Sequence, residues 1–153
     1  HNIAKVEKHK VDGEERKLVV HRKGATRAFP SNRAEIPSKY RDLGQPVLVP
    51  GSMGTSSWIL LGKSNSMDLS FGSTAHGAGR TMSRSKARRN FTEENVKKSL
   101  NDKGIFIKAL TRDGVVEETP EAYKDVDSVV NVSHNLGIAT KVAKLVPIGV
   151  IKG

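Results

Sequence analysis

The feature that most constrains this chain is the Asp12-Gly13 dipeptide within NIAKVEKHKVDGEERKLVVHRKGATRAF, where it separates two arms rich in strand-forming residues. Asp-Gly in this setting is a strong signal for a two-residue hairpin turn, because both turn residues must adopt positive φ angles. Counting outward from the turn gives the cross-strand pairs Val6 with Val19, Ala4 with His21, and Asn2 with Lys23. We therefore predict a long antiparallel hairpin. One of its faces carries the two valines and, towards the open end, Asn2, His21 and Lys23.

The middle of the chain contains two short apolar stretches, PVLVP and SSWILLG. They are predicted to be buried strands, joined by the Gly/Ser-rich loop GSMGT at residues 51–55. Residues 30–46 have no clear periodicity and are predicted to form a long surface loop. The terminal stretch KVAKLVPIGVIKG is predicted to end the chain with a buried strand.

Helical patterns occupy much of the second half. RTMSRSKARRNF has helical length and spacing, and FTEENVKKSLNDKG reads as a clearer helix capped by Thr92. GIFIKAL and GVVEET flank Asp113-Gly114 and are predicted to form a second hairpin, whereas a further helix is predicted from Pro120 to Gly137. Because strands gather in hairpins and no regular βαβ alternation occurs, we predict an α+β fold with mixed or antiparallel sheets.

Charge indicates the class of partner. The 153 residues carry 26 Lys and Arg against 16 Asp and Glu, a net charge of +10, which favours a polyanion, nucleic acid first and an anionic membrane second. Cysteine is absent from the sequence, which excludes disulfides and thiolate metal sites within it. The sequence contains no apolar run of membrane-span length and no signal peptide at its start, so we expect a cytoplasmic protein without a membrane partner.

The stretch SFGSTAHGAGRTMSRSKARR sets His76 among residues too small to cover it. Gly77-Ala78-Gly79 leads into the predicted helix with Arg80 in its first turn. Backbone N–H groups at a helix start bind anions, and glycines let a phosphate approach closely. Arg80 would be unfavourable against the helix dipole unless an anion lies nearby. The pattern therefore favours a phosphate site, with Arg80, Arg84 and Arg88 on one helical face.

The histidine itself has several possible roles. An imidazole with an ordinary pKa of about 6.5 keeps a free lone pair on much of its population at neutral pH. It can therefore attack phosphorus, bind a metal or relay a proton. The alternative is a Gly-rich surface turn with a half-exposed histidine. A second Gly/Ser-rich loop, PGSMGTSSW, and the basic segment HRKGATR leave the same choice between a phosphate site and an ordinary turn.

Five blocks, HNIAKVEKH, VHRKGATRAFP, GQPVLVPGSMGTSSW, GSTAHGAGRTMSR and LVPIGVIKG, occur in this order along the chain. Together they resemble the RtcB family of tRNA-splicing RNA ligases. The resemblance implies that residues 1–153 are the C-terminal portion of the ligase catalytic domain, without its N-terminal portion. Family members use GTP and Mn²⁺ to join RNA ends bearing a 2′,3′-cyclic phosphate or 3′-phosphate to 5′-hydroxyl ends, in tRNA splicing and RNA repair.

The resemblance also implies residue roles. His76 would be the nucleophile that takes GMP from GTP, Arg80 a catalytic phosphate-binding residue, and His1 a metal ligand. Lys23 and Arg84 would hold the RNA backbone. The implied nucleotide-binding set is Asn2, Pro50, Gly51, Ser52, Met53, Ser57, His76, Gly77, Ala78, Gly79, Tyr123 and Lys152, with Ser57, Tyr123 and Lys152 at the guanine.

The partners implied by the resemblance are RNA, as tRNA exon halves or broken ends, the missing N-terminal portion and an archease-type helper protein. The missing portion would supply the remaining metal ligands, including a cysteine. Two other functions fit the residues: a non-catalytic basic RNA-binding module, and a phosphotransferase that uses a phosphohistidine and a small-molecule acceptor. No role is assigned to His9, His21 or His134.

Overall fold

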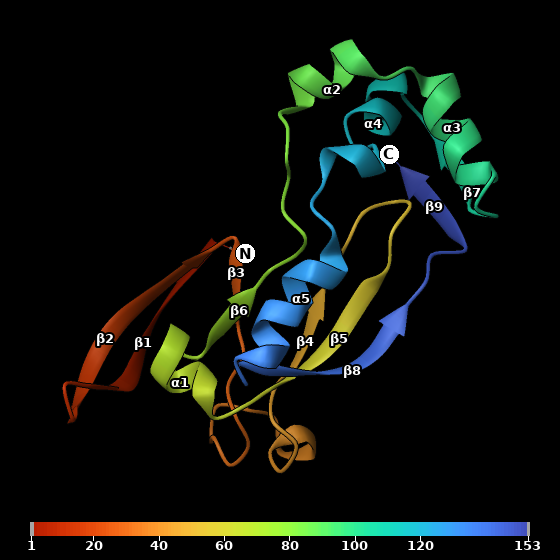
Figure 1. The fold of residues 1–153 in the computed structure, drawn as a ribbon. Coiled ribbons are helices and arrows are strands. Elements are labelled where there is room, and N and C mark those ends of the chain that lie inside the picture. The colour runs from red at the N-terminus through yellow and green to blue at the C-terminus, as the bar shows by residue number, and fades with distance from the viewer. Residues whose placement is uncertain (1, 153) are drawn as a thin grey trace.

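The computed structural model describes residues 2–152 (Figure 1). Strand β1 (Asn2–Val11) and strand β2 (Glu14–Lys23) form the predicted antiparallel hairpin, with Asp12 at φ 52° and Gly13 at φ 86° in the turn. Its register is the predicted one, with the pairs Val6 and Val19, Ala4 and His21, and Asn2 and Lys23. Figure 1 shows this hairpin extending to one side of the remaining elements.

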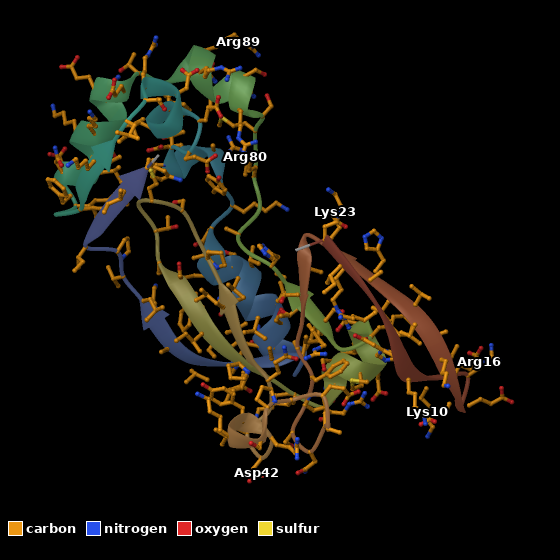
Figure 2. The ribbon with its side chains drawn as sticks, turned by 180° about the vertical axis from the view of Figure 1, so that it is seen from behind. Lys10, Arg16, Lys23, Asp42, Arg80 and Arg89 are labelled. Carbon is orange, nitrogen blue, oxygen red and sulfur yellow. The ribbon has the colours of Figure 1, made fainter. Side chains whose placement is uncertain are left out.

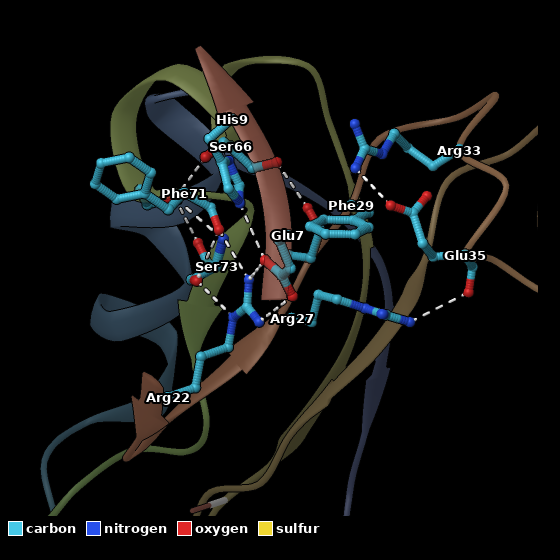
Figure 3. Close-up of polar contacts among 12 residues, drawn as sticks. Glu7, His9, Arg22, Arg27, Phe29, Arg33, Glu35, Ser66, Phe71 and Ser73 are labelled. Carbon is cyan, nitrogen blue, oxygen red and sulfur yellow. Dashed lines mark hydrogen bonds and ion pairs between the residues drawn. The ribbon is translucent and has the colours of Figure 1, made fainter. Parts of the chain in front are cut away.

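The hairpin is attached through its other face, by a group of side chains that we call the anchor cluster: Glu7, His9, Arg22, Phe71 and Ser73 (Figure 3). Arg22 donates to the two Glu7 carboxylate oxygens at 2.7 and 2.8 Å, and its Nε donates to the Ser73 hydroxyl at 2.8 Å. Arg22 also donates to the Phe71 carbonyl at 2.9 Å, while His9 Nε2 lies 3.0 Å from Glu7. The cluster therefore fixes the hairpin against the segment that leads to His76.

The central sheet holds the first hydrophobic core. Strands β4 (Pro46–Val49), β5 (Ser57–Gly62) and β8 (Ala139–Leu145) are antiparallel, in the order β4-β5-β8, and helix α5 (Val126–Asn135) packs on them. The buried residues of this core are Ala28, Val47, Val49, Leu60, Ala78, Val126, Val130 and Ala139. The two apolar stretches are thus strands, as predicted. Beside this sheet, β3 (Ala25–Arg27) and β6 (Ser73–Ala75) pair antiparallel, and the short helix α1 (Asn65–Ser70) precedes β6.

A second core lies among the helices α2 (Arg84–Asn90), α3 (Glu93–Asn101) and α4 (Arg112–Val116) and the parallel strands β7 (Phe106–Ala109) and β9 (Gly149–Lys152). Its buried residues are Met53, Val96, Leu100, Ile105 and Val115. Two short 3₁₀ segments, Ser38–Tyr40 and Pro120–Ala122, complete the described structure. Met53 comes from the GSMGT loop, so this loop is packed between the two cores.

The α+β class with largely antiparallel sheets is confirmed, but several local predictions are wrong. No second hairpin forms at residues 113 and 114, because Thr111 caps α4 by accepting from the Gly114 N–H, and β7 pairs instead with β9. The helix predicted from Pro120 begins only at Val126, because Asp125 accepts the first N–H groups of α5.

The ends of two further predicted elements also differ. The helix predicted to contain Arg80 begins at Arg84, where Ser83 accepts from the Lys86 N–H. The chain does not end in a buried strand, since β9 is a sheet edge on which Ile151 is 84% exposed. None of the helices within residues 2–152 is long and apolar enough to cross a membrane.

Candidate active site

A cavity of about 190 Å³ opens between the loop that follows β4, the segment that precedes α5, and the end of β9. Its lining residues are Pro50, Gly51, Ser52, Met53, Ser57, Glu118, Tyr123 and Lys152. Seven of these eight belong to the nucleotide-binding set that the resemblance implied. The eighth, Glu118, was missed. The structure therefore brings three distant segments of the chain around one small cavity.

The GSMGT loop is held in shape by its own hydroxyl groups. The Ser52 N–H donates to Thr55 Oγ1 at 2.7 Å, and the Gly51 N–H donates to Ser57 Oγ at 3.3 Å. A side chain at Gly51 would lie 2.1 Å from the Ser56 carbonyl oxygen, so only glycine fits. These two N–H groups are consequently satisfied by hydroxyl groups of the loop and of Ser57.

The histidine loop touches the wall of this cavity. The Ala78 N–H donates to the Pro50 carbonyl at 2.9 Å, and a Cβ on Gly77 would meet the same oxygen at 3.1 Å. Gly79 has φ 74°, a conformation that favours glycine. His76 is half-buried, two residues before the bond to Pro50. Because α2 begins only at Arg84, the prediction that residues 77–79 lead directly into a helix is wrong, and their N–H groups do not lie at a helix start.

The open end of the hairpin lies on the other side of His76. The His76 N–H donates to the Gly24 carbonyl at 3.3 Å, and Gly24 directly follows Lys23. Lys23 pairs with Asn2, whose side-chain oxygen lies 2.7 Å from His21 Nε2. Figure 2 shows Lys23 at this open end and Arg80 on the extended segment from β6 to α2. Asn2 and Lys23 are therefore near the histidine loop but do not line the cavity.

Arg80 is an extended residue that bridges to Tyr123, and its guanidinium faces protein groups. Nη1 donates to Tyr123 Oη at 3.0 Å and to Glu118 Oε1 at 3.4 Å. Nη2 donates to the Glu117 carbonyl at 2.6 Å, and Nε to the Met82 carbonyl at 3.0 Å. An arginine has five N–H donors, and these contacts use four of them. Little of the guanidinium remains for the phosphate that the sequence assigned to it.

Arg84 and Arg88 extend this group, which we call the pocket cluster: Arg80, Arg84, Arg88, Glu117, Glu118 and Tyr123. Arg84 Nε lies 3.3 Å from Glu117 and 3.4 Å from Glu118, and Arg88 pairs with Glu117. The regular spacing of the three arginines therefore does bring them to shared partners, although only two of them are helical. Arg84, predicted to contact RNA, has 65% of its side chain exposed.

Glu118 contributes a carboxylate to the cavity wall. The Tyr123 hydroxyl donates to Glu118 Oε2. Partial burial acts to raise the pKa of the Glu118 carboxyl, but the Tyr123 hydrogen bond and the charges of Lys152 and Arg80 outweigh it and hold that pKa below its usual value. Burial, together with the bond to Glu118, raises the pKa of Tyr123. The cavity thus presents a carboxylate and a neutral phenol.

The sequence carried no signal for Glu118. It stands in the EET run before Pro120, where it looks like one of many solvated acids, and only the fold turns it towards Lys152 and Tyr123. Two of the three histidines left without a role have side-chain partners: His9 lies in the anchor cluster, and His21 bonds to Asn2.

The described residues do not fit a complete metal site. Within residues 2–152, no three His, Cys, Asp or Glu side chains gather closely enough to hold an ion. His1, the implied metal ligand, lies outside the described residues.

Comparison with known proteins identifies the family of the chain. The family model for the tRNA-splicing ligase RtcB matches residues 1–153. The chain is 54% identical to the tRNA-splicing ligase RtcB of Nanoarchaeum equitans and 58% identical to that of Aeropyrum pernix, over 153 residues in both. These alignments cover all of this chain but 32% of each relative, and the chain covers 17% of the Pyrococcus abyssi protein, at 54% identity. The chain therefore spans a third or less of the length of these relatives, and it belongs to the RtcB family of tRNA-splicing ligases.

Proposed function

We propose that this chain is the C-terminal portion of the catalytic domain of an RNA ligase. The ligase joins ends bearing a 2′,3′-cyclic phosphate or 3′-phosphate to 5′-hydroxyl ends, in tRNA splicing and RNA repair. One observation carries the proposal. The Pro50 carbonyl, in the wall of the cavity, accepts a hydrogen bond from Ala78, two residues after His76. A base in the cavity would therefore lie beside the loop of the nucleophile.

The size of the cavity supports a binding mode in which only the base of the nucleotide lies inside it. Pockets for complete small molecules usually measure about 300–1,000 Å³, and this one measures about 190 Å³. It suits a single base, with the ribose and phosphates outside it. In the proposal these reach towards His76 along Gly77, Ala78 and Gly79.

Three transfers then follow. An imidazole nitrogen of His76 attacks the α-phosphorus of GTP, a P–N bond forms, and pyrophosphate leaves as the P–O bond breaks. An oxygen of the RNA 3′-phosphate next attacks the same phosphorus and releases His76. Finally the 5′-hydroxyl attacks the 3′-phosphorus, loses its proton and displaces GMP. A cyclic phosphate must first be hydrolysed to the 3′-phosphate.

The remaining residues have supporting roles in this proposal. Arg80 has one N–H left for a phosphate and mainly positions Glu118 and Tyr123. Lys23 and Arg84, both exposed, bind the RNA backbone, in keeping with the net charge of +10. Manganese would neutralise triphosphate charge, and its ligands would come from His1 and the N-terminal portion. A helper protein and a cytoplasmic location stay predictions.

The test uses the full-length protein, incubated with α-labelled GTP and Mn²⁺. We expect a covalent label that is labile in acid and stable in alkali, and that falls to background in His76→Ala. The matched control is His134→Ala, which removes an exposed histidine of α5 and should keep the label. A label that survives His76→Ala would exclude His76 as the nucleophile.

The same assay separates the two other functions. Retention of a γ-label would favour the phosphotransferase. Absence of any label, with RNA affinity that falls steeply with salt, would favour the non-catalytic RNA-binding module, which the net charge alone would support.

A further inference from the structure

The strand that precedes His76 is short. Strand β6 pairs with β3 over three residues, and His76 follows β6 directly, with its own N–H bonded to the Gly24 carbonyl. A ladder of this length fixes a segment weakly by itself, because even a complete two-stranded hairpin is only marginally stable in water. Other contacts must therefore hold β6 if the imidazole of His76 is to keep one position.

Ser73 connects β6 to the hairpin. Its hydroxyl accepts from Arg22 Nε at 2.8 Å, and Arg22 also donates to the Phe71 carbonyl at 2.9 Å (Figure 3). The Arg22 side chain is buried and also donates to both carboxylate oxygens of Glu7. A buried guanidinium with these partners has a fixed orientation, so the hairpin determines where Ser73 lies.

Thr74 connects β6 to helix α5. Its Oγ1 lies 2.8 Å from Ser133 Oγ, and both residues are buried. This bond resists separation of β6 from α5, because a buried hydroxyl that loses its partner carries a desolvation penalty. Successive side chains of a strand point to opposite faces. Ser73 and Thr74 therefore hold β6 from its two sides, and Figure 1 shows β6 between the hairpin and α5.

The turn that leads into β6 is also constrained. Phe71 and Gly72 both adopt left-handed φ angles, 49° and 62°. Such a conformation is uncommon for a residue other than glycine, and it persists where the surrounding structure determines it. Here Arg22 donates to the Phe71 carbonyl, and the Gly72 N–H donates to the Ser66 carbonyl at 2.7 Å. The path of the chain is thus determined before it reaches His76.

We propose that Ser73 and Thr74 are positioning residues, whose hydroxyl groups hold His76 in line with the phosphorus that it attacks. This inference rests on the proposed function, in which His76 is the nucleophile. Neither residue lines the cavity, so both act through the backbone of β6 and not on the nucleotide. The effect on rate is large enough to measure, because a misplacement of about 1 Å can slow a reaction by about 100-fold.

The experiment measures single-turnover labelling of His76 in the full-length protein, with Mn²⁺ and a range of concentrations of α-labelled GTP. Thr74→Val removes one hydroxyl at nearly constant volume, and Ser73→Ala removes the other. In each variant we expect the rate at saturating GTP to fall by about tenfold, with the half-saturating GTP concentration unchanged. The variants Thr74→Ser and Ser73→Thr retain a hydroxyl and should keep most of the rate.

The matched control is Thr81→Val. Thr81 follows the histidine loop, as Thr74 precedes it, and its hydroxyl donates to the Glu121 carbonyl at 3.4 Å. Loss of this long contact should leave the labelling rate unchanged. The unfolding free energy of every variant is measured in urea, because a merely structural role would lower it while the folded protein reacted at the unaltered rate.

The outcomes separate this inference from the function on which it rests. If His76 is labelled and both Thr74→Val and Ser73→Ala keep the unaltered rate, the inference fails and the proposed function stands. A raised half-saturating GTP concentration with an unchanged saturating rate would also overturn the inference, since the hydroxyls would then act on binding. If the label survives His76→Ala, the proposed function and the inference both fail.

The two variants also protect the test against misfolding. Should Thr74→Val not fold, Ser73→Ala decides alone, because Ser73 is partly exposed and its substitution leaves the ion pair of Arg22 and Glu7 in place. An unaltered rate in folded Ser73→Ala would then overturn the inference.

Discussion

Two groups of arginine and glutamate side chains occupy different environments in this molecule. In the anchor cluster, the side chains of Arg22 and Glu7 are 2% and 5% exposed, and the guanidinium forks onto both carboxylate oxygens. In the pocket cluster, those of Arg80 and Glu118 are 24% and 21% exposed, and the pair is 3.4 Å apart. The same two residue types thus form a buried, bidentate ion pair in the anchor cluster and a partly exposed, longer ion pair in the pocket cluster.

The difference indicates what each cluster does. A buried ion pair that satisfies its own hydrogen bonds has no remaining groups for a ligand, and it serves to fix elements relative to each other. A pair at the edge of a cavity keeps lone pairs and donors that a ligand can use. Arg22 joins the hairpin to the strand before His76, whereas Glu118 faces the space in which we propose that the base binds.

The largest expected effect comes from breaking the anchor cluster. Arg22→Met leaves the Glu7 carboxylate buried without its counter-charge, so we expect the free energy of unfolding to fall by about 3–5 kcal/mol, measured by urea denaturation of the full-length protein. The double variant Glu7→Leu with Arg22→Met removes both charges and should regain most of this loss. A loss below about 1 kcal/mol in the single variant would contradict a structural role for the pair.

The ion pair between Glu7 and Arg22 should also make the stability of the protein depend on pH in the acid range. Burial acts to raise the pKa of Glu7, but the hydrogen bonds from Arg22 and His9 and their charges outweigh it, so the folded-state pKa lies below the ordinary 4.5. The unfolded state therefore binds more protons in this range. The stability from Glu7 is present above pH 4.5 and is lost as pH falls through the folded-state pKa.

We accordingly expect the unfolding free energy of the unaltered protein to decline below about pH 4.5 and that of Glu7→Gln to decline less steeply. The matched control is Glu94→Gln, on the exposed side of α3, which should keep the unaltered slope. If the unfolding free energies of the unaltered protein and of Glu7→Gln declined in parallel, the Glu7 carboxyl would not contribute to the pH dependence of stability.

Local chemistry explains which parts of the fold could be predicted. The hairpin register follows from the turn at Asp12-Gly13 and from counting outward, and it is correct at every predicted pair. The turn signal at Asp113-Gly114 failed because Thr111 and the buried Val115 and Val116 favour a helical turn there, while β7 finds its partner about 40 residues away. Such long-range pairing leaves no local pattern.

In the candidate site, too, local motifs could be predicted and contacts between distant residues could not. The resemblance named seven of the eight residues around the cavity, and six of these, all but Tyr123, lie within the five motif blocks that carry the resemblance. It did not indicate that Arg80 lies in an extended bridge to Tyr123, since a spacing of four residues reads as a helical face. Glu118 escaped notice because its role depends on Tyr123, Arg80 and Lys152 meeting in space.

The smallest expected effect sharpens the comparison. Glu118→Gln should change the unfolding free energy by no more than about 1 kcal/mol, because partly exposed ion pairs are screened by water and Arg80 keeps its other bonds. Glu7→Gln, the same substitution in the anchor cluster, should cost clearly more in the same urea assay. If the two variants lose equal stability, Glu118 is a structural residue like Glu7, and its position in the cavity wall is a consequence of packing and not of base recognition.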